Sequence, residues 1–156
     1  MKTIDLTRGK VAIVDDEDYE FLNQFKWRYA SGYAVRWGPR NHYKRKMIFM
    51  HKLVIGIPDE TAMGDHINRN RLDNRRSNLR VATDTQNCRN SGIRSHNTTG
   101  YKGVAHRKHS TRWWARIVVD GKFIYLGQYD TAEEAALAYN KAAIKYFGEF
   151  ASPNKL

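Results

Sequence analysis

The segment GDHINRNRLDNRRSNLRVATDTQNCRN, residues 64–90, gathers side chains that can do chemistry around one histidine, His66. An imidazole titrates near neutral pH and can accept a proton from a reacting group. The carboxylate of Asp65 and the amide of Asn87 offer oxygens of the kind that bind hard divalent ions. Guanidinium groups bind phosphate oxygens in bidentate fashion. Five of them surround His66 in the sequence: Arg69, Arg71, Arg75, Arg76 and Arg80.

The overall charge favours a polyanionic partner. The 156 residues carry a formal net charge of +11, and the basic residues are spread along the chain rather than confined to a tail. Dispersed cations gain from counterion release when they bind phosphates, whereas a basic surface without a partner is the alternative interpretation. The apolar runs are too short to cross a bilayer, and residues 1–10 lack the apolar stretch of a signal peptide. We therefore predict an intracellular protein with no membrane partner.

The first half of the chain reads as short strands. A Ser31-Gly32 turn divides the aromatic segment 25–37, and residues 47–58 form an apolar segment that could be strand or helix. Between them lies a basic stretch with no acidic residue, which contains Arg36, Arg40, Lys44, Arg45 and Lys46. Cys88 is the one cysteine, so an intramolecular disulfide and a cysteine-rich zinc site are excluded.

The last third of the chain predicts a sheet and a helix. Residues 91–99 have the small, polar composition of a linker, and apolar alternation follows in 112–119 and 122–127 around an Asp120-Gly121 turn. Residues 101–106 supply a third strand. A helix then begins at the capping box of Thr131 and Glu134 and ends near Gly148. We predict three antiparallel strands packed on one helix.

Alternation also predicts the free face of that sheet. Trp114, Arg116 and Val118 share one side of their strand, and Phe123 and Tyr125 share the matching side of the next. A face of aromatics and arginine is suited to nucleic acid. Partial burial of this face against the rest of the protein is an equal alternative.

Four segments of this region, in order, resemble the AP2/ERF DNA-binding domain: GYKGV (100–104), WWARI (113–117), YLGQYDTAEEAALAYNKAA (125–143) and FGEFASPN (147–154). The resemblance implies a three-stranded sheet on one helix, with the sheet in the major groove of DNA. By position, it implies groove-facing roles for Lys102, Arg107, Trp114, Arg116, Val118, Phe123 and Tyr125. Ala105 and Phe123 stand where plant members have arginines, so the target preference of those members does not carry over.

The rest of the chain resembles HNH endonucleases of the homing type. The resemblance is carried by MHKLVIG (50–56), DHINRNRLDNRRSNLRVAT (65–83) and QNCRN (86–90), with the lead-in IDLTRGKVAIVDDEDYEFLNQFKW before them. It implies a ββα-metal finger, about residues 62–90, that holds one divalent ion, Mg²⁺ or Mn²⁺. The domains would then be a nuclease domain at 1–90, a linker at 91–99 and an AP2-like domain at 100–154. Together they form an α+β protein. The lead-in resembles that of phage and bacterial members, which implies the cytoplasm of a bacterial or phage-infected host cell.

The same resemblance assigns the site residues. His66 is the general base, Asp65 and Asn87 are metal ligands, and Asn78 is the central asparagine that ties down the loop, with Asn74 as second choice. The arginines around His66 are predicted to hold DNA phosphates, although one or two could pair with Asp73 or Asp84. Adjacent residues of a regular strand point to opposite faces, so Asp65 and His66 should not reach one site directly. Either the strand is irregular there, or the phosphate lies between base and metal.

We predict a metal-dependent endonuclease that hydrolyses phosphodiester bonds of double-stranded DNA, with the AP2-like domain for recognition. The rival is a DNA-binding regulator that no longer cuts, and an RNA-binding protein is a third possibility. No dimerisation heptad is visible, so a monomer is predicted. His51 lies in an apolar stretch, where a buried structural histidine is the commoner outcome and an accessory role in the site is the alternative.

Overall fold

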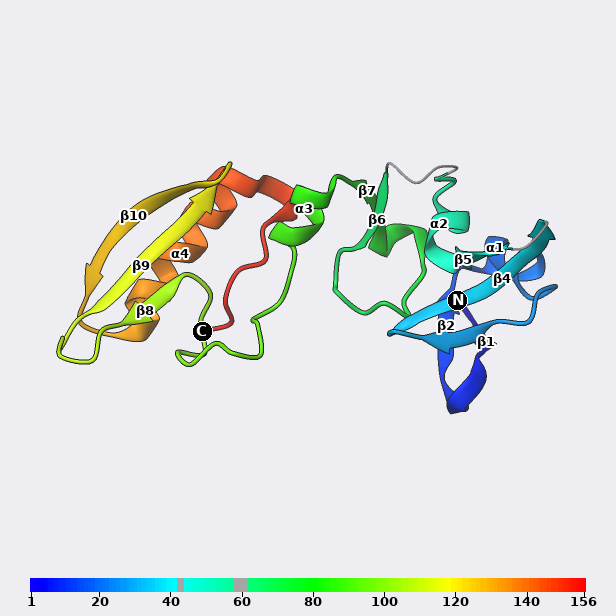
Figure 1. Cartoon of the computed structure of the whole chain (residues 1–156), viewed down its shortest axis with the longest axis horizontal. Coiled ribbons are helices and arrows are strands. Elements are labelled where there is room, and N and C mark those ends of the chain that lie inside the picture. Colours follow the sequence, from blue (N-terminus) through cyan, green and yellow to red (C-terminus); the bar gives the residue numbers. More distant parts are fainter. Residues whose placement is uncertain (42–43, 58–61) are drawn as a thin grey trace. The chain divides into compact units, whose positions relative to one another are not determined.

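The computed structural model describes residues 1–41, 44–57 and 62–156. They form a mixed α and β protein with antiparallel sheets and few helices (Figure 1). The chain divides into two compact units, which we call unit 1 (Met1–Asn87) and unit 2 (Cys88–Leu156). The division falls inside helix α3 (Asp84–Arg89), so the predicted domain limits stay predictions. None of the helices in the described ranges has the length and apolar character to span a bilayer.

Unit 1 begins with a hairpin and a short helix, β1 (Lys2–Asp5), β2 (Val11–Val14) and α1 (Asp16–Leu22), with a 3-10 turn η1 (Thr7–Gly9) between the strands. The strands pair antiparallel, and their inward side chains enter the core of the unit. Buried members of this core are Ile4, Leu6, Ala12, Val14, Leu22, Trp27, Ala34, Met50, Val54 and Leu79. The N-terminal elements therefore pack on the segments that follow them.

A three-stranded sheet follows, with the order β3 (Arg28–Ala30), β4 (Tyr33–Asn41), β5 (Lys44–Phe49). The turn between β3 and β4 is the predicted Ser31-Gly32 pair, with φ of 50° and 90°. The ambiguous apolar segment 47–58 divides between the end of β5 and helix α2 (Met50–Val54). Pro58, taken as its end, lies outside the described residues.

The chemically interesting segment forms two strands and a helix, β6 (Met63–His66), β7 (Leu79–Ala82) and α3, with a 3-10 turn η2 (Arg76–Asn78) before β7. The strands pair in a regular register from Met63↔Ala82 to His66↔Leu79. Thr83 rather than Asp84 caps α3, because the Gln86 N–H donates to Thr83 Oγ1 and the Thr83 N–H donates to Gln86 Oε1.

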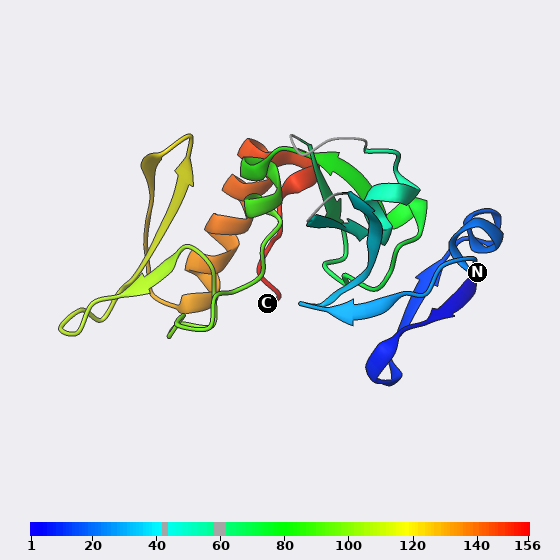
Figure 2. The same cartoon turned by 45° about the vertical axis from the view of Figure 1, so that its right-hand side comes forward.

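Unit 2 contains the predicted sheet, in the order β10 (Lys122–Tyr129), β9 (Trp113–Val119), β8 (Val104–His106), and the helix α4 (Ala132–Phe147). A short 3-10 turn η3 (Gly148–Phe150) follows the helix. The helix lies along one face of the sheet (Figure 2). The predicted capping box and the Gly148 cap are confirmed, and both turn residues Asp120 and Gly121 have positive φ, as a tight hairpin requires.

Small side chains let the helix approach the sheet closely. Ala115 and Ile117 of β9 are buried against Ala135, Ala136 and other helix residues. Gly103 shows how close the approach is, because a Cβ there would lie 2.1 Å from Cδ2 of Tyr139. The opposite face of the sheet, with Arg116, Val118, Phe123 and Tyr125, is exposed, as alternation predicted.

Candidate active site and nucleic-acid surface

His66 ends strand β6 and is almost fully buried, with 4% of its surface exposed. Its Nε2 lies 3.2 Å from Oδ1 of Asn74. When Nε2–H donates to this oxygen, the neutral ring keeps a lone pair on Nδ1. Burial lowers the pKa of His66, while the Asn74 hydrogen bond and the nearby Asp65 carboxylate oppose that shift. A neutral imidazole held by one nitrogen can accept a proton at the other.

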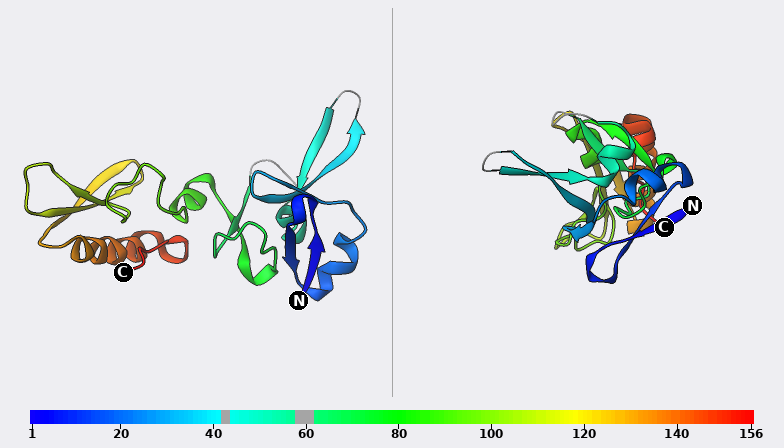
Figure 3. Two further views of the ribbon diagram at one scale, coloured as in Figure 1. Left: turned by 90° about the horizontal axis from the view of Figure 1, so that it is seen from below. Right: turned by 90° about the vertical axis from the view of Figure 1, so that its right-hand side faces the viewer.

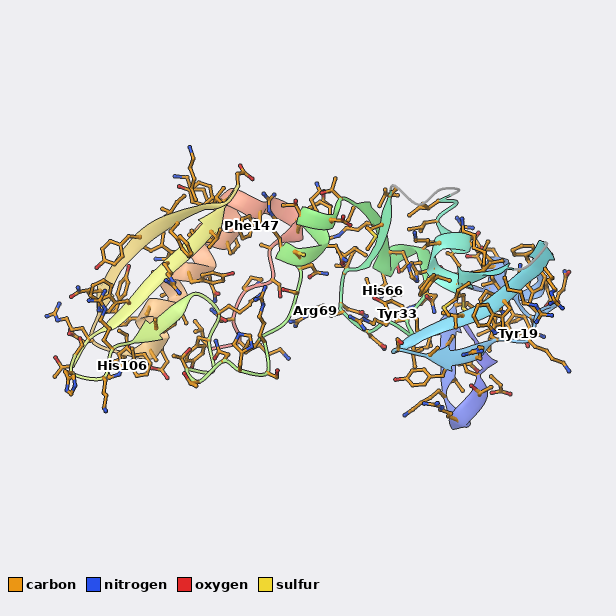
Figure 4. All side chains as sticks on the ribbon, in the orientation of Figure 1. Tyr19, Tyr33, His66, Arg69, His106 and Phe147 are labelled. Carbon is orange, nitrogen blue, oxygen red and sulfur yellow. The ribbon has the colours of Figure 1, made fainter. Side chains whose placement is uncertain are left out.

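Aromatic rings surround this histidine. The His51 ring meets the His66 ring edge-on at 4.9 Å between centroids, and the Tyr33 and His66 ring centroids are 6.1 Å apart. Figure 4 shows Tyr33 and His66 near each other in unit 1. His51 is itself buried, and desolvation lowers its pKa to about 3, so it is neutral at physiological pH. Gly64 leaves the space for it, since a Cβ there would lie 2.4 Å from Cδ2 of His51. No motif in the sequence points to Tyr33, because only the tertiary fold brings β4 to this site.

Asparagines build the loop between β6 and β7. Asn78 is buried; its Oδ1 accepts from the Asn68 N–H at 2.9 Å and its Nδ2 donates to the Asp73 carbonyl at 2.7 Å. Asn68 and Asn70 accept from backbone N–H groups two residues further on, as short amide side chains commonly do in turns. Asn78 thus bonds to backbone groups of Asn68 and Asp73 within the loop, whereas the Asn74 side chain contacts His66.

The N-terminal elements hold this loop in place. The Asn74 N–H donates to the Ile13 carbonyl, and the Ile13 N–H donates to the Leu72 carbonyl, each at 2.8 Å. At the other end of the loop, Arg76 Nη2 and Nε donate to the Asp18 carboxylate, at 2.6 and 2.9 Å. Strand β2 and helix α1 therefore fix the position of Asn74, and through it His66.

The two predicted metal ligands lie on different elements. Asp65 is directly opposite Arg80 across β6 and β7, and its Oδ2 accepts from Arg80 Nε at 2.8 Å. Asn87 lies half-buried on α3. Among the described residues, no group of three or more His, Cys, Asp or Glu side chains could hold a metal ion. The regular register of β6 leaves Asp65 and His66 with different partners, so the suggested irregular strand is not present in the structure.

The predicted phosphate-binding arginines fall into two groups. Three are committed to carboxylates within unit 1: Arg75 with Asp73, Arg76 with Asp18, and Arg80 with Asp65. The other two are exposed on the loop. Arg69 has a positive φ of 65°, and Arg71 lies over the Tyr33 ring at 4.6 Å and donates to the Ser31 carbonyl. Arg69 and Arg71 are therefore the loop cations best placed to meet an anionic ligand.

The exposed sheet face of unit 2 alternates cations and rings. Arg107 stacks over Trp114 at 3.9 Å, and Arg116 lies over Phe123 at 5.1 Å. The rings of Trp114 and Tyr125 are 5.5 Å apart. Lys102, by contrast, bonds to other residues of unit 2. Its backbone N–H donates to Asn154 Oδ1, and its Nζ donates to the Ser91 carbonyl. At the end of the predicted linker, Asn97 Oδ1 accepts from the Thr99 and Gly100 N–H groups.

Comparison with known proteins identifies the protein family. The family model for HNH endonuclease matches residues 53–89, and the AP2 domain matches residues 99–149. The chain is 32% identical over 150 residues, 96% of its length, to an uncharacterized HNH endonuclease of Acanthamoeba polyphaga mimivirus, of which it covers 77%. This protein therefore belongs to the HNH endonuclease family, and it carries an AP2 domain.

The AP2 domain has relatives among plant transcription factors. An ethylene-responsive transcription factor of Arabidopsis thaliana is 50% identical over 62 residues, 38% of this chain and 14% of the relative. APETALA2-like protein 2 of Oryza sativa subsp. japonica is 48% identical over 48 residues, 31% of this chain and 11% of the relative. The chain spans only a small part of these plant proteins, so their similarity concerns the domain alone.

Proposed function

We propose that the protein is a metal-dependent DNA endonuclease in which unit 1 hydrolyses phosphodiester bonds and unit 2 binds the DNA. The observation that carries the proposal is the hydrogen bond between His66 Nε2 and Asn74 Oδ1. With Nε2–H as the donor, this bond orients a buried imidazole in the tautomer that accepts a proton at Nδ1, and burial favours its neutral form. This is what a general base needs, because it must be unprotonated and must hold its orientation toward the attacking water.

In the proposed reaction, His66 Nδ1 takes a proton from a water molecule that attacks the phosphorus. Asn74 keeps the ring in its tautomer, and Asn78 keeps the loop that carries Asn74 in shape. Arg69 and Arg71 hold phosphate oxygens beside the base, because they are exposed and lie on the same loop. Arg75, Arg76 and Arg80 then act mainly as structural ion-pair partners in unit 1.

A divalent ion, Mg²⁺ or Mn²⁺, would be held by Asp65 and Asn87. Their carboxylate and amide oxygens fit a hard ion, and the chain order β6, β7, α3 supports a ββα-metal finger. Such an ion stabilises negative charge on the phosphate and on the departing 3′ oxygen. Asp65 would share its carboxylate between the ion and Arg80, whose nitrogens lie at 2.7 and 2.8 Å from Oδ2.

DNA recognition is assigned to the exposed sheet face of unit 2. Arg107 and Arg116 are each stacked on an aromatic ring, which orients the guanidinium groups without neutralising them. We expect Arg107→Ala and Arg116→Ala to weaken binding to a DNA duplex. Lys141→Ala, on an exposed position of α4, is the matched control and should leave binding unchanged.

The test is cleavage of supercoiled plasmid by the full chain with Mg²⁺, with Mn²⁺ or with EDTA. We expect relaxation or linearisation that needs the metal and is lost in His66→Ala. His109→Ala, at an exposed position of unit 2, controls for the loss of a histidine as such. Equal cleavage by wild type and His66→Ala would refute the assigned base. Light scattering of the purified chain tests the predicted monomer.

One observation favours the second candidate, a DNA-binding protein that no longer cuts. The buried carboxylate of Asp65 forms an ion pair with the half-buried Arg80, and that pairing competes with metal binding. Tight, salt-sensitive DNA binding without cleavage in either metal would support this candidate. Restoration of cleavage by Arg80→Gln would identify the ion pair as the block.

A further inference from the structure

A concentration of positive charge in unit 1 lies outside the site described above. Residues 33–49 contain five lysines and arginines and no acidic residue. Strand β3 pairs with β4 only from Tyr33 to Val35, so residues 36–41 and 44–48 form a two-stranded ribbon without a third strand in the described chain. We call these residues the basic ribbon. It extends beyond the rest of its unit in both views of Figure 3.

The register of the basic ribbon places like charges opposite each other. Arg40 and Arg45 are direct cross-strand partners. Both side chains are exposed, and neither forms an ion pair with an acidic residue of the described chain. Like charges at such positions repel and destabilise a strand pair. A bound polyanion would remove that repulsion. The arrangement costs folding stability and is explained by binding to such a ligand.

The loop around His66 shows the opposite balance. Arg75, Arg76 and Arg80 are each paired with a carboxylate of unit 1, so much of the charge on that loop is already compensated. Arg40 and Arg45 on the basic ribbon have no such carboxylate partner in the described chain, and neither do Arg69 and Arg71. A phosphate backbone that reaches His66 would need cations of this kind along its path.

Residues at the base of the ribbon pack against unit 1, whereas residues further along it are exposed. The Arg36 guanidinium lies 3.9 Å from the Phe25 ring centroid and is half-buried, so it fixes the base of the ribbon. Trp37 is 42% exposed, and Arg28 lies over its ring at 5.3 Å. Beyond that point, Arg40 and Arg45 extend the basic surface.

We propose that the basic ribbon is a DNA-binding arm that enters the major groove, with Arg40 and Arg45 on the flanking phosphates. The major groove of B-DNA admits a two-stranded β-ribbon, whereas the deep, narrow major groove of A-form RNA does not. The ribbon lies outside both family matches, 53–89 and 99–149. The inference rests on the proposed function, because it takes DNA as the ligand.

The test measures binding of the full chain to a mixed-sequence DNA duplex over a series of NaCl concentrations. Each phosphate contact contributes about 0.9 to the slope of log K against log [NaCl], so Arg40→Gln/Arg45→Gln should flatten the slope by about 1.8. Arg8→Gln/Lys10→Gln removes the same charge from exposed positions near η1 and should leave the slope unchanged. Arg40→Lys/Arg45→Lys should keep the wild-type slope.

The outcomes separate this inference from the proposed function. If wild type binds DNA in a salt-sensitive way and Arg40→Gln/Arg45→Gln has the same slope of log K against log [NaCl], the ribbon does not bind DNA. The proposed nuclease function is then unaffected. Failure of wild type to bind DNA overturns both. If Arg40→Gln/Arg45→Gln lowers the salt slope equally on an RNA duplex of the same sequence, the ribbon does not depend on the DNA major groove. Circular dichroism of each variant confirms that its fold is retained.

Discussion

Asp65 and Arg80 face each other across β6 and β7, with the guanidinium Nη2 of Arg80 2.7 Å from the carboxylate Oδ2 of Asp65. The Asp65 side chain is buried and that of Arg80 nearly so, with 5% and 11% of their surface exposed. One residue thus takes part in a structural ion pair and is also the proposed metal ligand. The stability and the chemistry of the site are therefore coupled through a single carboxylate.

Arg80→Leu should destabilise the protein by about 3–5 kcal/mol, because it removes the ion pair that compensates a buried carboxylate. Urea unfolding measures the loss. The double variant Asp65→Leu/Arg80→Leu should recover most of it, since no buried charge is then unpaired. Arg45→Leu, on the exposed ribbon, should change stability by no more than about 0.5 kcal/mol. A loss in Arg45→Leu as large as that in Arg80→Leu would contradict this account of the pair.

Asn74→Ala should lower the rate of DNA cleavage about 10–100-fold, the range typical when the outer partner of a functional histidine is removed. Its side chain fixes His66 Nε2, so the loss should appear in the cleavage rate and not in DNA affinity. Asn70→Ala is the control, because Asn70 accepts a backbone N–H of the same loop without touching His66. Full activity of Asn74→Ala would mean that His66 does not depend on this hydrogen bond.

Because of His51, the free energy of unfolding should decrease as the pH falls. Its pKa is about 3 in the folded state, below the ordinary value of 6.5, so the unfolded chain binds the extra proton. The stabilising effect is complete above pH 6.5 and is lost as the pH falls toward 3. Between pH 7 and pH 5 this linkage removes roughly 2 kcal/mol. His51→Phe should lack this part of the pH dependence in urea unfolding, and an unchanged dependence would rule the assignment out.

Gly103→Ala should destabilise unit 2 by about 2–5 kcal/mol, from backbone strain at φ +71° and overpacking against the helix. The added Cβ would meet Tyr139 and lie 2.5 Å from the Arg116 carbonyl. Gly100→Ala has nearly the same φ, +76°, but no atom within 4 Å of the added Cβ. It should cost only the strain, about 1–2 kcal/mol. Equal losses in thermal unfolding would show that packing at Gly103 is not decisive.

The sheet and helix of unit 2 follow from local rules that the sequence displays. Alternation assigns Ile117 to the core and Phe123 to the exposed face, because successive strand residues point to opposite sides. The Asp120-Gly121 turn and the Thr131 capping box also depend on residues only a few positions apart. Such features are fixed by backbone geometry, so the chain itself predicts them.

The surroundings of His66 were decided by tertiary structure alone. Tyr33 and His51 reach it from other elements, and Arg76 finds Asp18 at a separation of 58 residues. An arginine-rich segment looks the same in sequence whether its charges meet phosphates or carboxylates. By itself, then, the sequence determined the strands, turns, caps and family motifs, whose causes are local. Only the fold decided which arginines are neutralised, because an ion pair depends on the distance between charges and not on their spacing in the chain.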